Sequence, residues 1–398
     1  MNVLFWLNMG LDSHSTSGHL LMAVIEQVKK LGSEVTVLSK DTGGKEPAHL
    51  ERLAELGVHS RTILFSPPEK SNFAKRYLFE LQYIRQSSRL LNDSYNAVFI
   101  QSNFAAGFSV AIARRKCPHA RIIYNVQDVY PQDVMYAGRI SSSSPIYRTM
   151  LNVQKYAYRH SDEIITISED MEDLIVEAGA PKEKITVIYN WSYQDGLFDK
   201  ADIAPVIAEM FEPDVFHVVY AGNIGLFQNV DIVVDAAERL KGNENIRFHI
   251  FGSGLYKEQL EKRAAENGLD NLSFHPIQPH QLAPSVYASA SINLIPLGKN
   301  QYRAALPSKT ATCLACQRPI IFIIGKESKF GQRVMRETNC PVLAVDDVDG
   351  LVDCILKIRD GGIQTQTRQF FKDNCSITKN SMAYARIITD EERENKPV

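Results

Sequence analysis

Two short glycine turns are the first segments of this chain whose spacing could support chemistry. Residues 222–225, Gly-Asn-Ile-Gly, follow an apolar run, and residues 251–254, Phe-Gly-Ser-Gly, follow the next one. Glycines between a strand and a helix let backbone N–H groups approach an anion. Together the turns predict one edge of a parallel sheet that gathers loops around a phosphate-bearing ligand. Taken singly, each turn is explained more simply as an ordinary strand-to-helix connection.

Lys309 is the candidate cation for such a ligand. It follows Pro307 and Ser308, and serine is a frequent N-cap, so we expect Lys309 in the first turn of a helix. The helix macrodipole is positive at that end and does not favour lysine there. An anion in front of both would explain the position, and a solvent-exposed surface lysine is the alternative. Arg303 could supply a second cation or lie in solvent.

Asp128 is the candidate for acid–base chemistry. Residues 125–128, Asn-Val-Gln-Asp, continue directly from an apolar strand pattern. A carboxylate at the carboxyl end of a strand can orient or deprotonate a hydroxyl group. An aspartate that caps the turn ahead of Pro131 fits the local sequence equally well. Asp133 is less well placed for this role.

Composition narrows the remaining classes of chemistry. A net charge of −2 over 398 residues gives no electrostatic case for nucleic-acid binding. Cys313 and Cys316 lie in a helical apolar pattern, which favours core thiols over a metal or redox site. His14 and His19 flank the first loop without the further ligands that a metal needs, so we expect no metal.

The apolar pattern also bears on location. Residues 1–7 are typical of a first strand rather than a signal peptide. No apolar run approaches the roughly 18–20 residues of a membrane span. Reduced thiols fit the cytosol. We therefore expect a cytoplasmic protein that is at most attached to a membrane surface.

The elements that must position these residues alternate strand and helix in two halves. Continuous apolar strands are typical of parallel sheets covered by helices on both faces. In the first half, the predicted strands are Val3–Leu7, Glu34–Leu38, Ala97–Gln101, Arg121–Asn125, Glu163–Ile167 and Ile185–Tyr189. In the second half, they are Phe216–Tyr220, Arg247–Phe251, Leu272–His275, Ile292–Pro296, Ile320–Ile324 and Val342–Val345.

This pattern predicts an α/β protein with two doubly wound, Rossmann-like domains that face each other across a cleft. Residues 190–213 carry Gly196, Pro205 and Pro213 with little strand pattern, as expected of a linker. We place the domains at residues 1–195 and 196–375, with a C-terminal helix over about 376–398 that could pack back on the first domain. Ligands should bind where the carboxyl ends of the strands meet the cleft.

Over essentially its whole length the chain resembles the retaining glycosyltransferases of the GT4 family, which have the GT-B fold. The motifs that carry the resemblance are Ser17-Gly18, residues 31–37, Tyr189-Asn190-Trp191, the two glycine turns and residues 306–320. Residues 128–131, Asp-Val-Tyr-Pro, and the Pro-Ser-Lys segment look most like the branch that builds O-antigen, capsule and colanic-acid-type polysaccharides.

The resemblance implies sugar transfer with retention of configuration, from a nucleotide sugar to a lipid-linked or glycan acceptor, without metal or cofactor. A UDP-sugar is the expected donor for this branch. The second domain would bind the nucleotide and the first the acceptor, at the inner face of the membrane. Asp128 and Lys309 would be the catalytic residues. The implied donor-binding residues are Ser17, Gly18, Gly222, Asn223, Gly225, Gln228, Gly252, Ser253, Gly254, Pro307, Ser308 and Thr312.

Some positions depart from the family pattern. Asn223 and the Gln228-Asn229 pair stand where an arginine and a lysine are usual, and Ala304 and Thr312 align with two glutamates. Two alternatives therefore stay open. One is an epimerase or phosphorylase of the same fold, although no segment resembles a pyridoxal phosphate site. The other is a non-catalytic partner subunit that binds nucleotide or glycan.

Residues 70–91 form a further pattern of interest. Phe73, Tyr77, Leu81, Ile84 and Leu91 make one apolar stripe, flanked by Arg76, Arg85 and Arg89. Basic flanks around an aromatic-rich face are typical of an interfacial helix that binds anionic lipid. A core helix with a solvated edge is the alternative.

Overall fold

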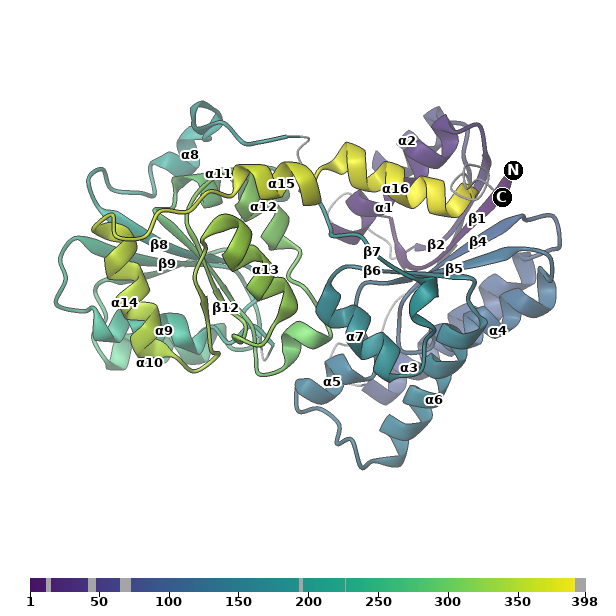
Figure 1. Ribbon diagram of the computed structural model, residues 1–398, viewed down its shortest axis with the longest axis horizontal. Coiled ribbons are helices and arrows are strands. Elements are labelled where there is room, and N and C mark those ends of the chain that lie inside the picture. Colours follow the sequence, from purple (N-terminus) through teal and green to yellow (C-terminus); the bar gives the residue numbers. More distant parts are fainter. Residues whose placement is uncertain (12–15, 42–47, 65–72, 193–195, 226, 391–398) are drawn as a thin grey trace. The chain divides into compact units, whose positions relative to one another are not determined.

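The computed structural model describes residues 1–11, 16–41, 48–64, 73–192, 196–225 and 227–390. It divides into two compact units, Met1–Asn190 with Ile377–Val398, and Trp191–Ser376. The change of unit falls between Asn190 and Trp191 rather than at residue 195. His14 and part of the expected linker lie outside the described residues. Each unit contains a parallel sheet with helices on both faces (Figure 1), so the predicted pair of Rossmann-like domains is confirmed.

The first unit has a parallel sheet in the order β3-β2-β1-β4-β5-β6-β7. Its strands are β1 Asn2–Gly10, β2 Glu34–Asp41, β3 His59–Leu64, β4 Ala97–Gln101, β5 Arg121–Val126, β6 Glu163–Thr166 and β7 Ile185–Val187. Its helices are α1 Thr16–Lys30, α2 Ala48–Glu55, α3 Phe73–Ser87, α4 Ala106–Lys116, α5 Gln132–Tyr136, α6 Pro145–His160, α7 Glu169–Glu177 and α16 Ile377–Thr389. The chain thus returns to the first unit through its last helix.

The second unit has a parallel sheet in the order β10-β9-β8-β11-β12-β13. Its strands are β8 Phe216–Ala221, β9 Ile246–Phe251, β10 Leu272–His275, β11 Ile292–Pro296, β12 Ile320–Ile323 and β13 Val342–Leu343. Its helices are α8 Pro205–Ala208, α9 Asp231–Arg239, α10 Lys257–Glu266, α11 Ala283–Ser289, α12 Lys309–Ala315, α13 Lys329–Thr338, α14 Val348–Arg359 and α15 Arg368–Asn374.

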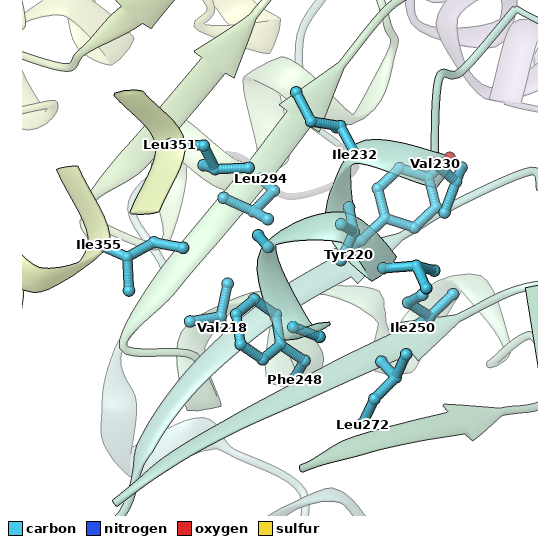
Figure 2. Packing of buried hydrophobic residues seen from close by; sticks show 14 of the residues in the cluster. Val218, Tyr220, Val230, Ile232, Phe248, Ile250, Leu272, Leu294, Leu351 and Ile355 are labelled. Carbon is cyan, nitrogen blue, oxygen red and sulfur yellow. The ribbon is translucent and has the colours of Figure 1, made fainter. Parts of the chain in front are cut away.

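Alternate residues of β8 and β9 pack into different layers of the second unit. Val218, Tyr220 and Phe248 belong to a large cluster that also takes side chains from α9 and α14, as Figure 2 shows. Val219 and Phe251 point the other way, into a smaller cluster beneath α8 and α11. Because successive side chains of a strand alternate between faces, this two-sided burial requires the continuous apolar runs seen in the sequence.

A row of three histidines crosses the second face of this sheet. His217 Nδ1 lies 3.0 Å from His249 Nε2, and His249 Nδ1 lies 3.0 Å from His275 Nε2. The outer nitrogen of His217, Nε2, lies 2.8 Å from the Glu212 carbonyl oxygen. Burial lowers the pKa of all three rings, and that of His249 falls to about 3. The row is therefore uncharged at neutral pH.

Helix α3 matches the core alternative better than the interfacial one. Ile84 and Leu91 of the expected stripe are buried, and Tyr83 next to it is fully buried. The Tyr83 hydroxyl donates to the Leu7 carbonyl oxygen at the middle of β1. Leu78, at 64% exposure, is the one large apolar side chain described on α3 that is mostly in solvent. The part of α3 whose side chains are described thus buries Tyr83 and Ile84 and half-buries Tyr77 and Leu81, and Phe73 lies outside the described side chains.

Within the described residues, no helix is both long enough and apolar enough to cross a bilayer.

Candidate functional site

The two glycine turns of the second unit lie directly against each other. The Gly222 N–H donates to the Phe251 carbonyl oxygen, and the Ile224 N–H donates to the Ser253 carbonyl oxygen, each at 2.9 Å. A Cβ atom on Gly252 would lie 1.9 Å from the Gly222 oxygen, and one on Gly254 would lie 2.1 Å from the Ile224 oxygen. Glycine is therefore required at both positions by the contact between loops.

This contact leaves several N–H groups without a protein partner. In the described part of the chain, the backbone N–H groups of Asn223, Gly225, Ser253 and Gly254 donate no hydrogen bond. Gly222 was expected to offer its N–H to a ligand, but that group is used by Phe251. The remaining groups lie on both turns, beyond the carboxyl ends of β8 and β9, where backbone donors can bind an anion.

Lys309 reaches this edge from the first residue of α12. Its Nζ donates to the Ala221 carbonyl oxygen at 3.0 Å and lies 3.7 Å from the centre of the Tyr220 ring. A Cβ atom on Gly222 would lie 3.0 Å from the same Nζ, so glycine makes room for the ammonium group. Burial lowers the pKa of Lys309 from 10.5 to about 7. The predicted cation thus lies at the first glycine turn.

Tyr220 was not identified from the sequence, although it supports both parts of this site. The Lys309 ammonium group packs against the face of its ring, and its hydroxyl donates to the Asn223 carbonyl oxygen at 2.5 Å. The side chain is fully buried. Its place inside an apolar run made it look like a core residue, and the sequence holds no signal that would separate the two roles.

The other residues predicted around Lys309 have different environments. Ser308 occupies the predicted N-cap position of α12, but its side chain accepts no capping hydrogen bond. Its backbone is already helical, and the side chain of such a residue cannot reach the first N–H groups as a cap does. Thr312 is buried and accepts a hydrogen bond from Ser192 at 3.4 Å, as expected of a helix residue that packs inside the unit.

Asn223 and Gln228 form a neutral pair at the positions where the resemblance leads us to expect cations. The Asn223 side-chain amide donates to Gln228 Oε1 at 3.1 Å. A Cβ atom on Gly225 would lie 2.9 Å from the Asn223 Nδ2 atom, so the pair folds over the turn. The pair contributes no charge, and Lys309 brings a cation to the first turn.

Asp128 lies in the first unit, just beyond the carboxyl end of β5. Desolvation, with a smaller contribution from the Asp133 carboxylate, raises the pKa of Asp128 from 3.8 to about 7. Burial, with smaller contributions from both carboxylates, raises the pKa of Tyr130. Asp133 was judged less well placed, but it acts on the same site from the first turn of α5. The backbone N–H of Asp128 points to Ser102 Oγ at 3.5 Å.

Side-chain amides fix the strand end that carries Asp128. Asn125 Nδ2 donates to Gln101 Oε1 at 2.7 Å, joining the last parts of β4 and β5. Tyr384, on α16, donates to Asn125 Oδ1 at 3.1 Å. Gln127 Nε2 lies 3.3 Å from the Tyr384 hydroxyl oxygen. The last helix thus helps to set the backbone from which Asp128 projects.

Ser17 and Gly18 lie in the first turn of α1, and Gly18 is buried. They were expected in a loop after the first strand, and the loop residues 12–15 lie outside the described residues. In the described part of the chain, no group of three or more His, Cys, Asp or Glu side chains is arranged to hold a metal ion. Cys313, on α12, and Cys316, directly after that helix, are buried free thiols.

Two protein-family models match this chain, one in each unit. Residues 17–191 match the glycosyl transferase 4-like domain, and residues 215–360 match the glycosyl transferases group 1 domain. The probable glycosyltransferase WbjE of Pseudomonas aeruginosa is 24% identical over 67% of this chain and 68% of its own length. The putative colanic acid biosynthesis glycosyl transferase WcaI of Escherichia coli is 28% identical over 54% of each chain.

Solved structures share the fold of the whole chain. Anabaena HepE in complex with UDP and glucose has a TM-score of 0.62 and 16% identity, covering 99% of this chain and 98% of HepE. WaaG, a glycosyltransferase involved in lipopolysaccharide biosynthesis, has a TM-score of 0.67 and 12% identity over 97% of this chain and 99% of WaaG. The two matched domains account for both units, and the chain belongs to the glycosyltransferases with a 4-like domain followed by a group 1 domain.

Proposed function

We propose that this protein transfers a sugar from a nucleotide-sugar donor, bound at the glycine turns of the second unit, to a hydroxyl group of an acceptor bound by the first unit. The observation that carries the proposal is the Lys309 ammonium group beside backbone N–H groups that have no partner in the described part of the chain. A diphosphate needs both kinds of group.

The donor phosphates would occupy the edge formed by the two turns. As the glycosidic bond of the donor breaks, negative charge grows on the leaving diphosphate. Lys309 would stabilise that charge as a cation, and the N–H groups of Asn223, Gly225, Ser253 and Gly254 would orient the phosphate oxygens. Pre-positioned donors of this kind cost little reorganisation during the reaction. No metal ion is needed in this scheme, and retention of configuration is part of the proposal.

The nucleoside would extend toward the ends of β9 and β10. Leu255 and Ile277 are 86% and 60% exposed there, directly after the second turn and after β10. Large apolar side chains in solvent at a sheet edge can make contacts with a base and a ribose. The complex of HepE with UDP supports a uridine nucleotide as the first choice.

In the first unit, Asp128 would orient the acceptor hydroxyl and accept its proton. A carboxylate with a pKa of about 7 is better suited to that task than an ordinary aspartate, because a general base works best near the operating pH. The names of WbjE and WcaI support an acceptor from surface-polysaccharide assembly, either lipid-linked or a glycan.

A non-catalytic partner subunit is the second candidate. It is favoured by the neutral Asn223–Gln228 pair and by Ala304 and Thr312, which are buried and uncharged where the resemblance leads us to expect glutamates. Such a subunit would bind nucleotide without transferring sugar.

A donor screen separates the two candidates. The purified protein is titrated calorimetrically with UDP, GDP and their common sugar derivatives, and each bound donor is then tested for slow hydrolysis and for transfer to polyprenyl-diphosphate-linked sugars. Binding with hydrolysis or transfer supports the enzyme. Binding without any turnover favours the partner subunit, and no binding at all contradicts both.

A further inference from the structure

Lys309 is a charged side chain with an unusual set of neighbours. Its ammonium group contacts one carbonyl oxygen, that of Ala221, and the face of the Tyr220 ring. Within the described residues, no carboxylate forms an ion pair with it. A partly buried ammonium group usually keeps its charge through such a pair. Here the aromatic ring and one carbonyl dipole replace the missing carboxylate.

This environment favours the uncharged amine more than water does. The Tyr220 ring and the Ala221 carbonyl oxygen attract the cation. Desolvation outweighs this attraction and lowers the pKa of Lys309 to about 7. The titratable groups that face Nζ are the Tyr220 phenol from β8 and the Cys313 thiol on the same helix. Burial raises the pKa of both groups well above neutrality, so neither carries charge that would hold a proton on Lys309.

We propose that Lys309 takes up a proton when a nucleotide-sugar diphosphate binds, so that donor affinity falls as the solution becomes more alkaline. This inference rests on the proposed function of the site. The proton comes from hydronium or a buffer acid: its bond to that donor breaks as the new N–H bond to the Nζ lone pair forms, and the conjugate base stays in solution. The proton leaves Lys309 again when the diphosphate product departs, because the ammonium group then has no negative charge beside it.

The direction in which donor affinity changes with pH follows from the linkage between protonation of Lys309 and binding of the donor. A diphosphate next to Nζ supplies the missing negative charge, so the pKa of Lys309 is higher in the complex than in the free protein. Below the free value of about 7 the amine is already charged and affinity is constant. Above it, each unit of pH should weaken donor binding about tenfold, until the pKa of the complex is reached.

Calorimetry of UDP-glucose binding tests this inference. UDP-glucose is chosen because its phosphates, unlike the terminal phosphate of UDP, carry no group that titrates near neutrality. The titration is repeated at about pH 8 in two buffers that differ in ionisation enthalpy. A difference in binding heat between the buffers that corresponds to uptake of most of one proton is expected, together with an affinity that falls between neutral and alkaline pH.

Two variants of Lys309 provide matched controls. Lys309→Arg keeps a permanent charge and should bind with no proton uptake and with an affinity independent of pH. Lys309→Gln carries no charge, and at every pH its affinity should equal the alkaline limit of the unmodified protein. The thermal unfolding transition of each variant confirms that it is folded, and the glutamine variant keeps the test valid if arginine does not fit beside Gly222.

The outcomes distinguish this inference from the function on which it rests. UDP-glucose that binds with equal heat in both buffers and with constant affinity would overturn proton uptake and leave the donor site standing. If UDP-glucose does not bind, the titration uses the donor found in the screen. A protein that binds no nucleotide sugar at any pH would overturn both proposals.

Discussion

Asp128 in the first unit and Lys309 in the second carry opposite charges, yet their pKa values both lie at about 7. Both side chains are partly buried, neither forms an ion pair within the described residues, and desolvation is the main cause of both shifts. The surroundings differ. Asp128 is raised further by a second carboxylate, Asp133, whereas Lys309 is held by an aromatic ring and a carbonyl oxygen.

The comparison shows that the same desolvation has opposite consequences for the two units. Asp128 gains its charge as pH rises, while Lys309 loses its charge over the same range. A reaction that needs an ionised Asp128 and a charged Lys309 is therefore confined to a narrow range around neutrality, unless a bound donor extends the alkaline side.

Lys309→Ala tests the second unit and should give the largest effect. The variant lacks the cation that stabilises the leaving diphosphate, so turnover at saturating donor should fall about 10²–10³-fold. Lys299→Ala is the matched control, because it removes an exposed lysine from the loop after β11. A Lys309→Ala variant with nearly unchanged turnover would contradict the assignment.

Asp128→Asn tests the first unit. The amide cannot accept a proton, so turnover should fall about 10²-fold, at the low end for loss of a general base because water can replace it in part. Donor affinity measured by calorimetry should stay within a few-fold, because Asp128 lies in the unit that would bind the acceptor. Loss of nucleotide affinity with normal turnover would instead assign Asp128 to the donor.

The stability of Asp128→Asn sharpens the comparison. In the folded protein the pKa of Asp128 is raised from 3.8 to about 7. Between these two pH values the unfolded chain therefore binds fewer protons than the folded one. The free energy of unfolding consequently decreases as pH rises through this range. Asp128→Asn removes that penalty, and the melting temperature above neutral pH should rise by about 2–4 °C, or about 1 kcal/mol. Near pH 4 the gain should vanish. Asp93→Asn, at an exposed position, should show neither effect, and an equal gain at both pH values would contradict this explanation.

Tyr220→Phe should give the smallest effect. The ring beneath Lys309 remains, but the hydroxyl that bonds to the Asn223 carbonyl oxygen is lost. Loss of about 1 kcal/mol of positioning energy would weaken donor binding about fivefold while leaving its pH dependence in place. Tyr124→Phe, which removes a buried hydroxyl bonded to Gln154 in the other unit, is the control for stability alone. Unchanged donor affinity in Tyr220→Phe would mean that the turn holds its shape without the hydroxyl.

The sequence predicted the central strands well because buried parallel strands are continuous apolar runs. The bounds of β4, β10 and β11 agree with the predicted ranges. Strand β3 was missed because its side chains are mostly exposed at the edge of the sheet. Alternation and apolarity carry no signal for such a strand.

The sequence predicted the parts of the site that depend on residues close together in the chain. Lys309 does begin a helix, and the two glycine turns do follow neighbouring strands. The Ser308 side chain does not cap α12, because the backbone of Ser308 is already helical, and the sequence does not reveal that conformation. Tyr220, Asp133 and Tyr384 act through contacts made by the fold, and the Tyr384–Asn125 bond spans 259 residues of sequence. No local pattern contains that information.

The histidine row in the second unit has a direction that the contacts alone determine. The Glu212 carbonyl can only accept, so His217 must carry its hydrogen on Nε2. Its Nδ1 then accepts from His249 Nε2–H, and His249 Nδ1 accepts from His275 Nε2–H. All three neutral rings are therefore held in one tautomer, with their dipoles aligned. Only His275 Nδ1 is left with no partner in the described part of the chain, and the carbonyl of that residue accepts from Gly252 N–H at 3.2 Å. A proton can enter the row without breaking it only at this end, beside the second glycine turn.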